Sequence, residues 1–293
     1  MHKQSLTLIA PTILHKAKGS CIMARVLIID AGLKAGWTKA AADRLAELLQ
    51  KDGSIEIDRV NIRDEHISPC TGCAICLERG EQRCRNHGDS ADLIIGKMLA
   101  ADGIITVSPN YSLQVPTLLK NVYDRLAYVF HRPRLFGRLS MAVVVQGVFG
   151  GGKIVSYINE IMSFWGAGTI KGAVVSGGLY PNSRMDANVL AKRNAELERA
   201  AARFASRLKG YRQGRPSLFR LAIFRMTRSS MKYSPEALQA DRKYYEDNGW
   251  FESGYYYDVR LDPVSMIMGS LIDRMIRRMI TKGSSSAVQE VGR

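Results

Sequence analysis

Apolar residues follow two periods along the chain up to about residue 210. Five short runs rich in β-branched and aliphatic residues are predicted to be strands, at residues 24–30, 54–62, 103–108, 139–147 and 170–178. Five longer stretches carry apolar residues three and four positions apart and are predicted to be helices, at residues 38–50, 91–100, 115–130, 153–165 and 187–209. Thr38 is the expected N-cap of the first helix. Strands that alternate with helices in this way indicate βαβ units and a parallel sheet.

The order of these elements predicts an α/β protein with a flavodoxin-like, doubly wound five-stranded parallel sheet of strand order 2-1-3-4-5 and a C-terminal helical extension. Ligands of such sheets bind beyond the carboxyl ends of the strands, at the point where the strand order reverses. The loops after the first, third and fourth strands are therefore expected to meet at one crevice. Their sequences are DAGLKAGWT, SPNYSLQVP and QGVFGGG.

Both ends of the chain differ from this central region. Residues 1–22 precede the first strand and are expected to be a disordered extension. Residues 210–293 lack the βαβ rhythm and contain an aromatic cluster and two amphipathic stretches, at 218–228 and 264–279. The second stretch carries Arg274, Arg277 and Arg278 on its flank. A basic amphipathic helix can lie on a membrane, but it more often packs on its own domain or on a dimer mate, which is the interpretation favoured here.

Composition and charge narrow the class of protein. The chain has 293 residues, 46% of them hydrophobic, and a formal net charge of +15. Because no nucleic-acid-binding motif is present, this charge is interpreted as a solvated basic surface and no nucleic-acid partner is predicted. No stretch reaches the roughly 18 uncharged apolar residues that a membrane span needs. The N-terminus also lacks the pattern of a signal peptide, so a cytoplasmic protein is expected.

Four of the five cysteines lie in one window with the spacing C-x2-C-x2-C-x7-C, at Cys70, Cys73, Cys76 and Cys84. Thiolates two residues apart can turn toward a common centre, and a fourth thiolate from a following loop can complete the shell. The compact run favours an iron–sulfur cluster such as [4Fe-4S] over zinc, whose ligands usually come in two separated pairs. Zinc and free or redox-cycling thiols stay open as alternatives, whereas a disulfide framework fits a long chain without a secretory signal poorly.

The loop SPNYSLQVP is the most specific motif after the cysteines. Ser108, Tyr111 and Ser112 supply hydroxyls and backbone amides at the end of a central strand, and the tyrosine ring can lie against a flat heterocycle. The alternative is an ordinary strand-to-helix loop shaped by Pro109 and Pro116. Its combination with the cysteine window favours a ligand site.

Over roughly residues 24–180 the chain resembles the NAD(P)H-dependent FMN reductase and iron–sulfur flavoprotein group of flavodoxin-like proteins. The resemblance rests on ISPCTGCAICLERGEQRC, on Asp89 and Asp92 that follow it, and on ADGIITVSPNYSLQVPTLLKNVYDRL with its Lys120, Asp124 and Arg125. It implies FMN as cofactor, NAD(P)H as co-substrate, a homodimer, and residues 23–209 as the FMN-binding domain. By the same resemblance two loops contact the isoalloxazine ring, through Ser108, Pro109, Asn110, Tyr111 and Ser112 on one side and Gly147, Val148, Phe149 and Gly150 on the other.

The first loop departs from this family. Members usually carry a Gly-Ser-x-Arg-x-x-Gly-Asn-Thr pattern that cradles the FMN phosphate at a helix N-terminus. Gly36 and Thr38 remain here, and Gly32, Lys34, Gly36 and Thr38 are the predicted contacts. Asp30 brings a carboxylate near the expected dianion, which opposes binding. The phosphate therefore either rests further along the loop, against Lys34, Thr38 and the helix start, or binds weakly.

The resemblance implies an FMN-dependent NAD(P)H oxidoreductase that passes reducing equivalents to a quinone, a flavin or another small acceptor, or to a redox protein partner. If the cysteines hold a cluster, the protein is an iron–sulfur flavoprotein that acts as an electron carrier. The altered phosphate loop supports an alternative to both, a flavin-free interaction module that docks through its C-terminal helix. Hydride transfer between stacked rings needs no acid or base, so no catalytic side chain is predicted.

Overall fold

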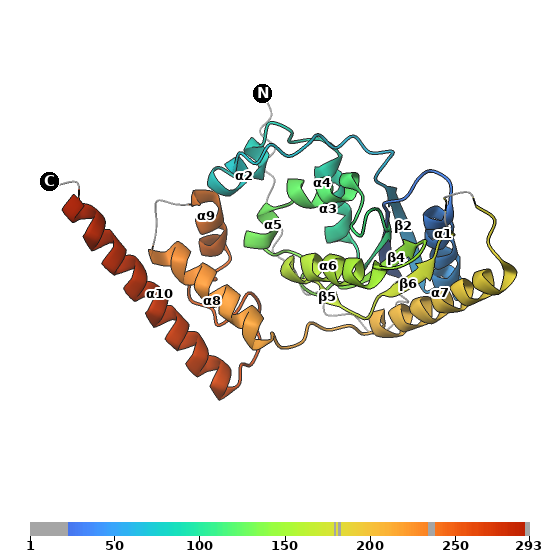
Figure 1. The fold of residues 1–293 in the computed structure, drawn as a ribbon. Coiled ribbons are helices and arrows are strands. Elements are labelled where there is room, and N and C mark those ends of the chain that lie inside the picture. The colour runs from blue at the N-terminus through green and yellow to red at the C-terminus, as the bar shows by residue number, and fades with distance from the viewer. Residues whose placement is uncertain (1–22, 179, 181–182, 234–237, 291–293) are drawn as a thin grey trace, which may run out of the picture.

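The structure is a computed structural model that describes residues 23–290 except residues 179, 181–182 and 234–237. The extension expected at residues 1–22 lies outside the described residues. Figure 1 shows a twisted parallel sheet with helices on both faces and a group of helices at one end of the molecule. The strands are β1 (Ala24–Asp30), β2 (Ile55–Asn61), β3 (Gly103–Pro109), β4 (Leu139–Gln146), β5 (Gly168–Thr169) and β6 (Ala173–Ser176).

The predicted strand order 2-1-3-4-5 is confirmed, with β2 at the edge and every pairing parallel. Two short strands replace the single strand predicted at residues 170–178. β5 precedes the predicted range, β6 lies within it, both pair with β4, and the division between them falls at residues 170–172. Gly172 lies at the division, where an added Cβ would come within 2.3 Å of the Ala142 carbonyl oxygen. The close approach of the two backbones explains why the pairing is interrupted there and why glycine occupies the position.

Helices cover both faces of the sheet because parallel strands are apolar on both sides. The first face packs against α1 (Trp37–Gln50) and α7 (Ala187–Leu208). The opposite face packs against α3 (Ser90–Ala100), α4 (Thr117–Arg125), α5 (Tyr128–His131) and α6 (Gly151–Phe164). The single helix predicted over residues 115–130 is therefore wrong, since two helices, α4 and α5, occupy that stretch.

The N-cap predicted for the first helix is also wrong. α1 begins at Trp37, its N-cap is Gly36, and Thr38 lies buried within the first turn. Gly36 has a φ of 113°, a backbone conformation that favours glycine over any residue with a Cβ. The chain therefore enters α1 through glycine, without a hydroxyl cap.

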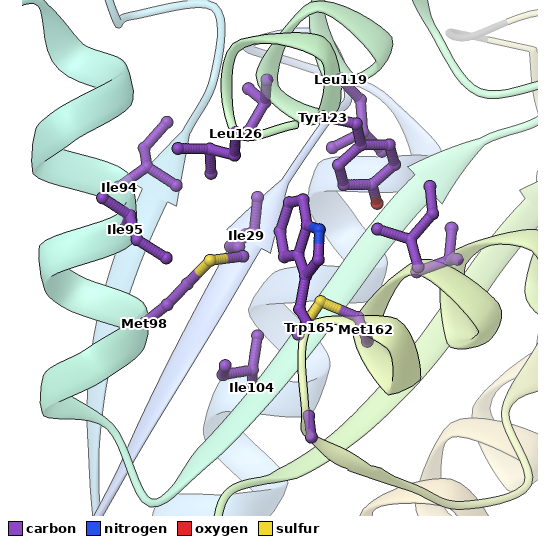
Figure 2. Close-up of a cluster of buried hydrophobic side chains, with 14 of the residues drawn as sticks. Ile29, Ile94, Ile95, Met98, Ile104, Leu119, Tyr123, Leu126, Met162 and Trp165 are labelled. Carbon is purple, nitrogen blue, oxygen red and sulfur yellow. The ribbon is translucent and has the colours of Figure 1, made fainter. Parts of the chain in front are cut away.

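Trp165 is the largest fully buried side chain and lies at the centre of the core between the sheet and α3, α4 and α6 (Figure 2). The Tyr123 ring meets it edge-on with centroids 5.6 Å apart. Burial raises the pKa of Tyr123 far above its usual value, so its hydroxyl stays protonated. This core holds α4 against the carboxyl end of the sheet and so positions the loops described below.

The predicted C-terminal helical extension is present as α8 (Leu218–Tyr233), α9 (Gln239–Asp247) and α10 (Pro263–Glu290). It has its own aromatic core around Phe224, Tyr245 and Trp250. Phe136 in the loop before β4 packs on this core, 5.4 Å from the Tyr256 ring. A domain boundary between residues 209 and 210 stays a prediction. Among the helices that the structure describes, none is long and apolar enough to cross a membrane.

Candidate functional site

A cleft lies at the carboxyl ends of β1, β3, β4 and β6, at the switch point of the sheet. All three loops predicted to meet there contribute to it. Of the predicted cofactor contacts, six line the cleft: Gly36, Thr38, Pro109, Asn110, Tyr111 and Gly147. The seven others are not among the lining residues: Gly32, Lys34, Ser108, Ser112, Val148, Phe149 and Gly150.

The cleft also has lining residues that were not among the predicted cofactor contacts. They are Leu33, Ala35, Trp37, Val145, Gln146, Gly177, Gly178 and Tyr180. Of these, Leu33, Ala35, Trp37 and Gln146 lie in the predicted loops. Gly177 and Gly178 follow β6, so the loop after a fourth strand joins the three predicted ones. A pair of glycines directly after a parallel strand was the available signal, because backbone that approaches a ligand closely is often glycine.

The N-terminus of α1 opens into the cleft. Gly36 makes no side-chain capping bond, and the first turn of the helix contains no acidic residue. The first amides of a helix have no partner within it, and the helix dipole favours negative charge at this end. The glycine backbone and the free amides together fit a phosphate group without any hydroxyl cap.

The carboxylate of Asp30 is turned into the first loop. Asp30 is only 3% exposed and is not among the cleft-lining residues. Its Oδ1 accepts the Gly32 amide proton at 2.8 Å, in the turn that Asp side chains often make with their own backbone. Burial raises the pKa of Asp30, and the Gly32 hydrogen bond opposes part of that rise. Asp30 therefore shapes the loop, and the repulsion expected between this carboxylate and a phosphate is reduced.

Lys34 is engaged at the surface. Its Nζ lies 2.5 Å from Asp64 Oδ1, and both side chains are more than half exposed. An exposed pair of this kind contributes little to stability and can be exchanged for another anion. Its predicted contact with a phosphate stays a prediction.

The Ser-Pro-Asn-Tyr loop is a tight turn held in a strained conformation. Tyr111 and Gln114 exchange both backbone hydrogen bonds, at 3.0 and 2.9 Å. Ser112 and Leu113 between them have φ values of 49° and 64°, in the left-handed region. Such a conformation costs a non-glycine residue about 1–2 kcal/mol, and strain of this kind gathers at functional sites. The turn presents the Tyr111 ring, 40% exposed, at the mouth of the cleft.

Two side chains of this loop face the protein. Ser108 is fully buried, and its hydroxyl donates to the Pro109 carbonyl at 2.9 Å. The Asn110 side-chain amide donates to the Phe149 carbonyl at 2.7 Å, which joins this loop to the loop after β4. Val148 and Phe149 are then left 71% and 66% exposed beside the cleft. Exposed apolar side chains at a rim indicate a surface that meets a ligand.

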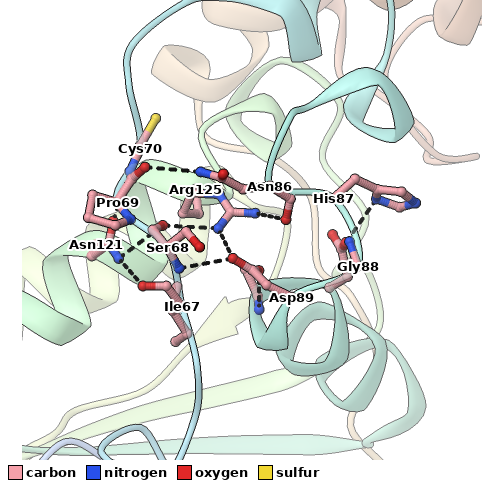
Figure 3. A network of polar contacts seen from close by, with 12 residues as sticks. Ile67, Ser68, Pro69, Cys70, Asn86, His87, Gly88, Asp89, Asn121 and Arg125 are labelled. Atoms are coloured by element: carbon pink, nitrogen blue, oxygen red, sulfur yellow. Dashed lines mark hydrogen bonds and ion pairs between the residues drawn. The ribbon is translucent and has the colours of Figure 1, made fainter.

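The segment that carries the four cysteines, residues 68–89, is called the cysteine loop. A buried ion pair holds it to α4 and α3 (Figure 3). The Arg125 guanidinium bonds to the Asp89 carboxylate, and their side chains are 4% and 8% exposed. Arg125 also donates to the carbonyls of Ser68 at 3.0 Å and Asn86 at 2.9 Å. The Asp89 carboxylate additionally accepts the Ser68 and Ala91 amides, both at 3.0 Å, and so caps α3. One ion pair thus closes both ends of the loop.

A second set of contacts joins the cysteine loop to the C-terminal extension. Glu81, between Cys76 and Cys84, pairs with Arg132 at 2.8 Å and with Arg134 at 2.7 Å. Arg132 also pairs with the fully buried Asp241 of α9 at 2.9 Å, and it donates to the Cys76 carbonyl at 2.6 Å. His131 Nδ1 lies 2.7 Å from the same Asp241 carboxylate. The position of the loop therefore depends on α9.

The four thiols share this loop but do not meet. Cys70 and Cys73 are exposed, and Cys76 and Cys84 are half-buried. Burial raises the pKa of Cys76, Arg132 opposes the rise, and the neighbouring Cys70 and Cys84 add to it. Within the described ranges, no three His, Cys, Asp or Glu side chains form a group that could hold a metal ion. The residue types fit an iron–sulfur cluster, whereas their positions in this structure do not.

Comparison with known proteins gives matches to one family model, to related sequences and to solved structures. The model of the NADPH-dependent FMN reductase family matches residues 24–180. An iron–sulfur flavoprotein of Archaeoglobus fulgidus is 28% identical over 230 residues, which are 78% of this chain and 100% of that protein. An iron–sulfur flavoprotein of Methanosarcina thermophila is 34% identical over 119 residues, 40% of this chain and 61% of that one. The crystal structure of RosB with a bound intermediate, 8-demethyl-8-formylriboflavin-5′-phosphate, superposes with a TM-score of 0.50 at 12% identity. The match covers 82% of this chain and 92% of the RosB chain. At this identity it shows the fold alone.

Proposed function

The chain belongs to the NADPH-dependent FMN reductase family, and we propose that it binds FMN in the cleft and reduces a small acceptor, a quinone or a free flavin, at the expense of NAD(P)H. The observation that carries the proposal is the cleft itself, where an uncapped helix N-terminus and an exposed tyrosine stand at the ends of adjacent strands. A homodimer is part of the proposal, as the resemblance implies.

The residues at the two ends of the cleft have different tasks. The amides at the start of α1, between Gly36 and Thr38, hold the phosphate, and the Asp30–Gly32 turn keeps this loop in place. Tyr111 and the backbone of Gly147, which line the cleft, would hold the flat ring of the flavin. Bound FMN supplies the hydride chemistry that no amino-acid side chain offers. The exposed Val148 and Phe149 exclude water from the open side.

Gly178→Ala is expected to weaken FMN binding at least about tenfold, the equivalent of about 1.4 kcal/mol. Gly178 lines the cleft with a φ of 69°, and an added Cβ would lie 2.4 Å from Ser183 Oγ and 3.1 Å from Trp37 Nε1. Trp37, which also lines the cleft, or the loop at Ser183 must then shift and change the shape of the cleft. The measurement is the dissociation constant of FMN, from the quenching of its fluorescence.

Gly53→Ala is the matched control for this variant. Gly53 has the same φ of 69°, but an added Cβ there meets no atom within 4 Å. Both substitutions place a methyl group at the same φ, but only the one at Gly178 brings that group against other atoms and lies in the cleft. Equal FMN affinity in both variants would contradict the proposed cleft. Protein that stays colourless after incubation with FMN and desalting would favour the flavin-free interaction module instead.

We also propose that the four cysteines hold an iron–sulfur cluster after a local closure of their loop. The proposal is supported by the match to the Archaeoglobus fulgidus iron–sulfur flavoprotein over its full length and by the compact C-x2-C-x2-C-x7-C spacing of the four cysteines. Protein loaded anaerobically with iron and sulfide is expected to show a broad brown absorbance that dithionite bleaches. Cys84→Ser is expected to abolish it, whereas Cys21→Ser, outside the window, is expected to retain it. Unchanged spectra in both variants would remove the four-thiolate cluster.

A further inference from the structure

The outer face of α10 is apolar and is not covered by any part of the chain that the structure describes. Five side chains at helical spacing are about half or more exposed: Val264 65%, Ile267 63%, Leu271 54%, Met275 49% and Met279 62%. Figure 1 shows α10 as the outermost helix, with α8 on one side and no element on the other. A run of exposed apolar residues of this length marks an interaction surface. We define these five residues as the α10 face.

The opposite side of α10 packs against α8 within the C-terminal extension. Asp273 Oδ2 pairs with Arg225 at 2.8 Å and Arg228 at 2.5 Å, and its Oδ1 accepts the Ser229 hydroxyl at 2.7 Å. Gly269 lies so close to α8 that an added Cβ would come within 2.9 Å of Arg225 Nε. These contacts fix the rotation of α10 about its axis. The α10 face cannot turn inward to find cover on its own domain.

Positive charge accompanies the α10 face. Arg274 and Arg278 are exposed and line a shallow hollow together with Leu271, Met275 and Met279, and Arg277 is exposed on the flank of α10 toward α8. Within the described ranges no ion pair involves these three arginines, although Arg277 lies over the Tyr233 ring at 5.6 Å and Arg274 donates to the Ser270 carbonyl. The acidic residue of this stretch, Asp273, faces α8. The surface is thus both apolar and cationic.

This combination selects among the partners that could cover the face. A second copy in a symmetric dimer presents the same patch, so Arg274 and Arg278 would meet a surface with apolar side chains and no free carboxylate. A bilayer that contains anionic lipid offers acyl chains to the apolar side chains and negative headgroups to the arginines. We propose that the α10 face docks the protein peripherally on an anionic membrane surface. A homodimer formed elsewhere on the surface is compatible with this docking.

Docking would bring the cleft, where the acceptor is reduced in the proposed function, close to the membrane. This consequence rests on the proposed function, since a membrane-bound reductase that uses a quinone would meet its acceptor in the bilayer. The docking itself does not depend on FMN, so the two proposals can fail separately. It is therefore tested with purified full-length protein and vesicles, without any measurement of activity.

Sedimentation with vesicles tests the docking. The protein is expected to bind vesicles of phosphatidylcholine with about a third of phosphatidylserine and to bind pure phosphatidylcholine vesicles at least about tenfold more weakly. Ile267→Ser with Leu271→Ser is expected to reduce binding to the anionic vesicles at least tenfold, because it removes apolar side chains from the face. Arg274→Gln with Arg278→Gln is expected to reduce it about twenty-fivefold, about fivefold for each arginine, and to weaken its salt dependence.

Leu93→Ser is the control, because Leu93 is a 49% exposed apolar residue on α3, away from α10. It is expected to bind the vesicles as the unaltered protein does. Circular dichroism melting checks that each variant is folded, and sedimentation velocity measures its oligomeric state. Absence of binding to anionic vesicles would overturn the proposal. So would a dimer that the Ile267→Ser, Leu271→Ser variant converts to monomer, since a second copy would then be the partner of the α10 face.

Discussion

Replacing Arg125 by methionine is expected to lower the free energy of unfolding by about 3–5 kcal/mol, the usual cost of removing one partner of a buried ion pair. The substitution leaves the Asp89 carboxylate buried without its cation and deprives the Ser68 and Asn86 carbonyls of their donor. Because these contacts close both ends of the cysteine loop, the loop is expected to become accessible to protease. Urea unfolding followed by circular dichroism measures the change in stability.

The same ion pair gives the stability a defined dependence on pH. Burial by itself would raise the pKa of Asp89, but hydrogen bonds from Arg125 and from the Ala91 and Ser68 amides outweigh it and lower the pKa. A carboxyl whose pKa is lower in the folded state stabilises the protein above its unfolded value of about 4, and this contribution is lost as the pH falls through the folded pKa. The loss below about pH 4 is expected to be smaller in Arg125→Met.

Arg44→Met is the matched control. Arg44 pairs with Glu47 and Glu198 on the surface, where its side chain is 37% exposed. Exposed pairs are worth at most about 1 kcal/mol, so this variant is expected to unfold at nearly the same urea concentration as the unaltered protein. An equally small loss in Arg125→Met would contradict the structural role assigned to the buried pair.

Asp241→Asn is expected to destabilise the protein by about 3 kcal/mol and to loosen the cysteine loop. Asp241 is fully buried and holds both Arg132 and His131. Arg132 keeps its pair with Glu81 in the variant, so the loss is placed at the lower end of the range for a broken buried pair. Hydrogen exchange of the amides in residues 75–84 is expected to become faster, because α9 no longer holds Arg132 beneath the loop.

Asp247→Asn on the same helix provides the comparison. Asp247 makes an exposed pair with Lys243 at 2.8 Å, and its loss is expected to change neither the stability nor the exchange of residues 75–84 by a measurable amount. Unchanged exchange of the loop in Asp241→Asn would contradict the proposed link between α9 and the cysteines.

Much of the fold could be predicted because strands buried on both faces of a parallel sheet have almost continuously apolar sequences. β1, β3 and β4 are almost continuously buried and apolar, so each was visible without knowledge of its neighbours. Turn-rich loops at the strand ends then indicated the cleft. The division between β5 and β6 could not be predicted in the same way, since it arises where the backbones at Gly172 and Ala142 approach each other.

In the candidate site, too, some features could be predicted from the sequence and others could not. Asp89 and Arg125 stood out in the sequence as parts of motifs, but their pairing across 36 positions appeared only when α3 and α4 were packed together. The orientation of Asp30 and the burial of Ser108 likewise followed from neighbouring strands. A side chain's type is local information, whereas the direction in which it points depends on what surrounds it.

The sequence by itself determined the strand order, the three loops that meet at the cleft, and the spacing of the four cysteines. Only the tertiary structure decided that Gly177 and Gly178 complete the cleft, that Asp241 holds His131 from 110 positions away, and that the arginines of α10 lie beside an uncovered apolar face. The physical reason is that hydrophobic periods report burial along one element. Which distant element supplies the contact depends on how the whole chain packs, and no local pattern records it.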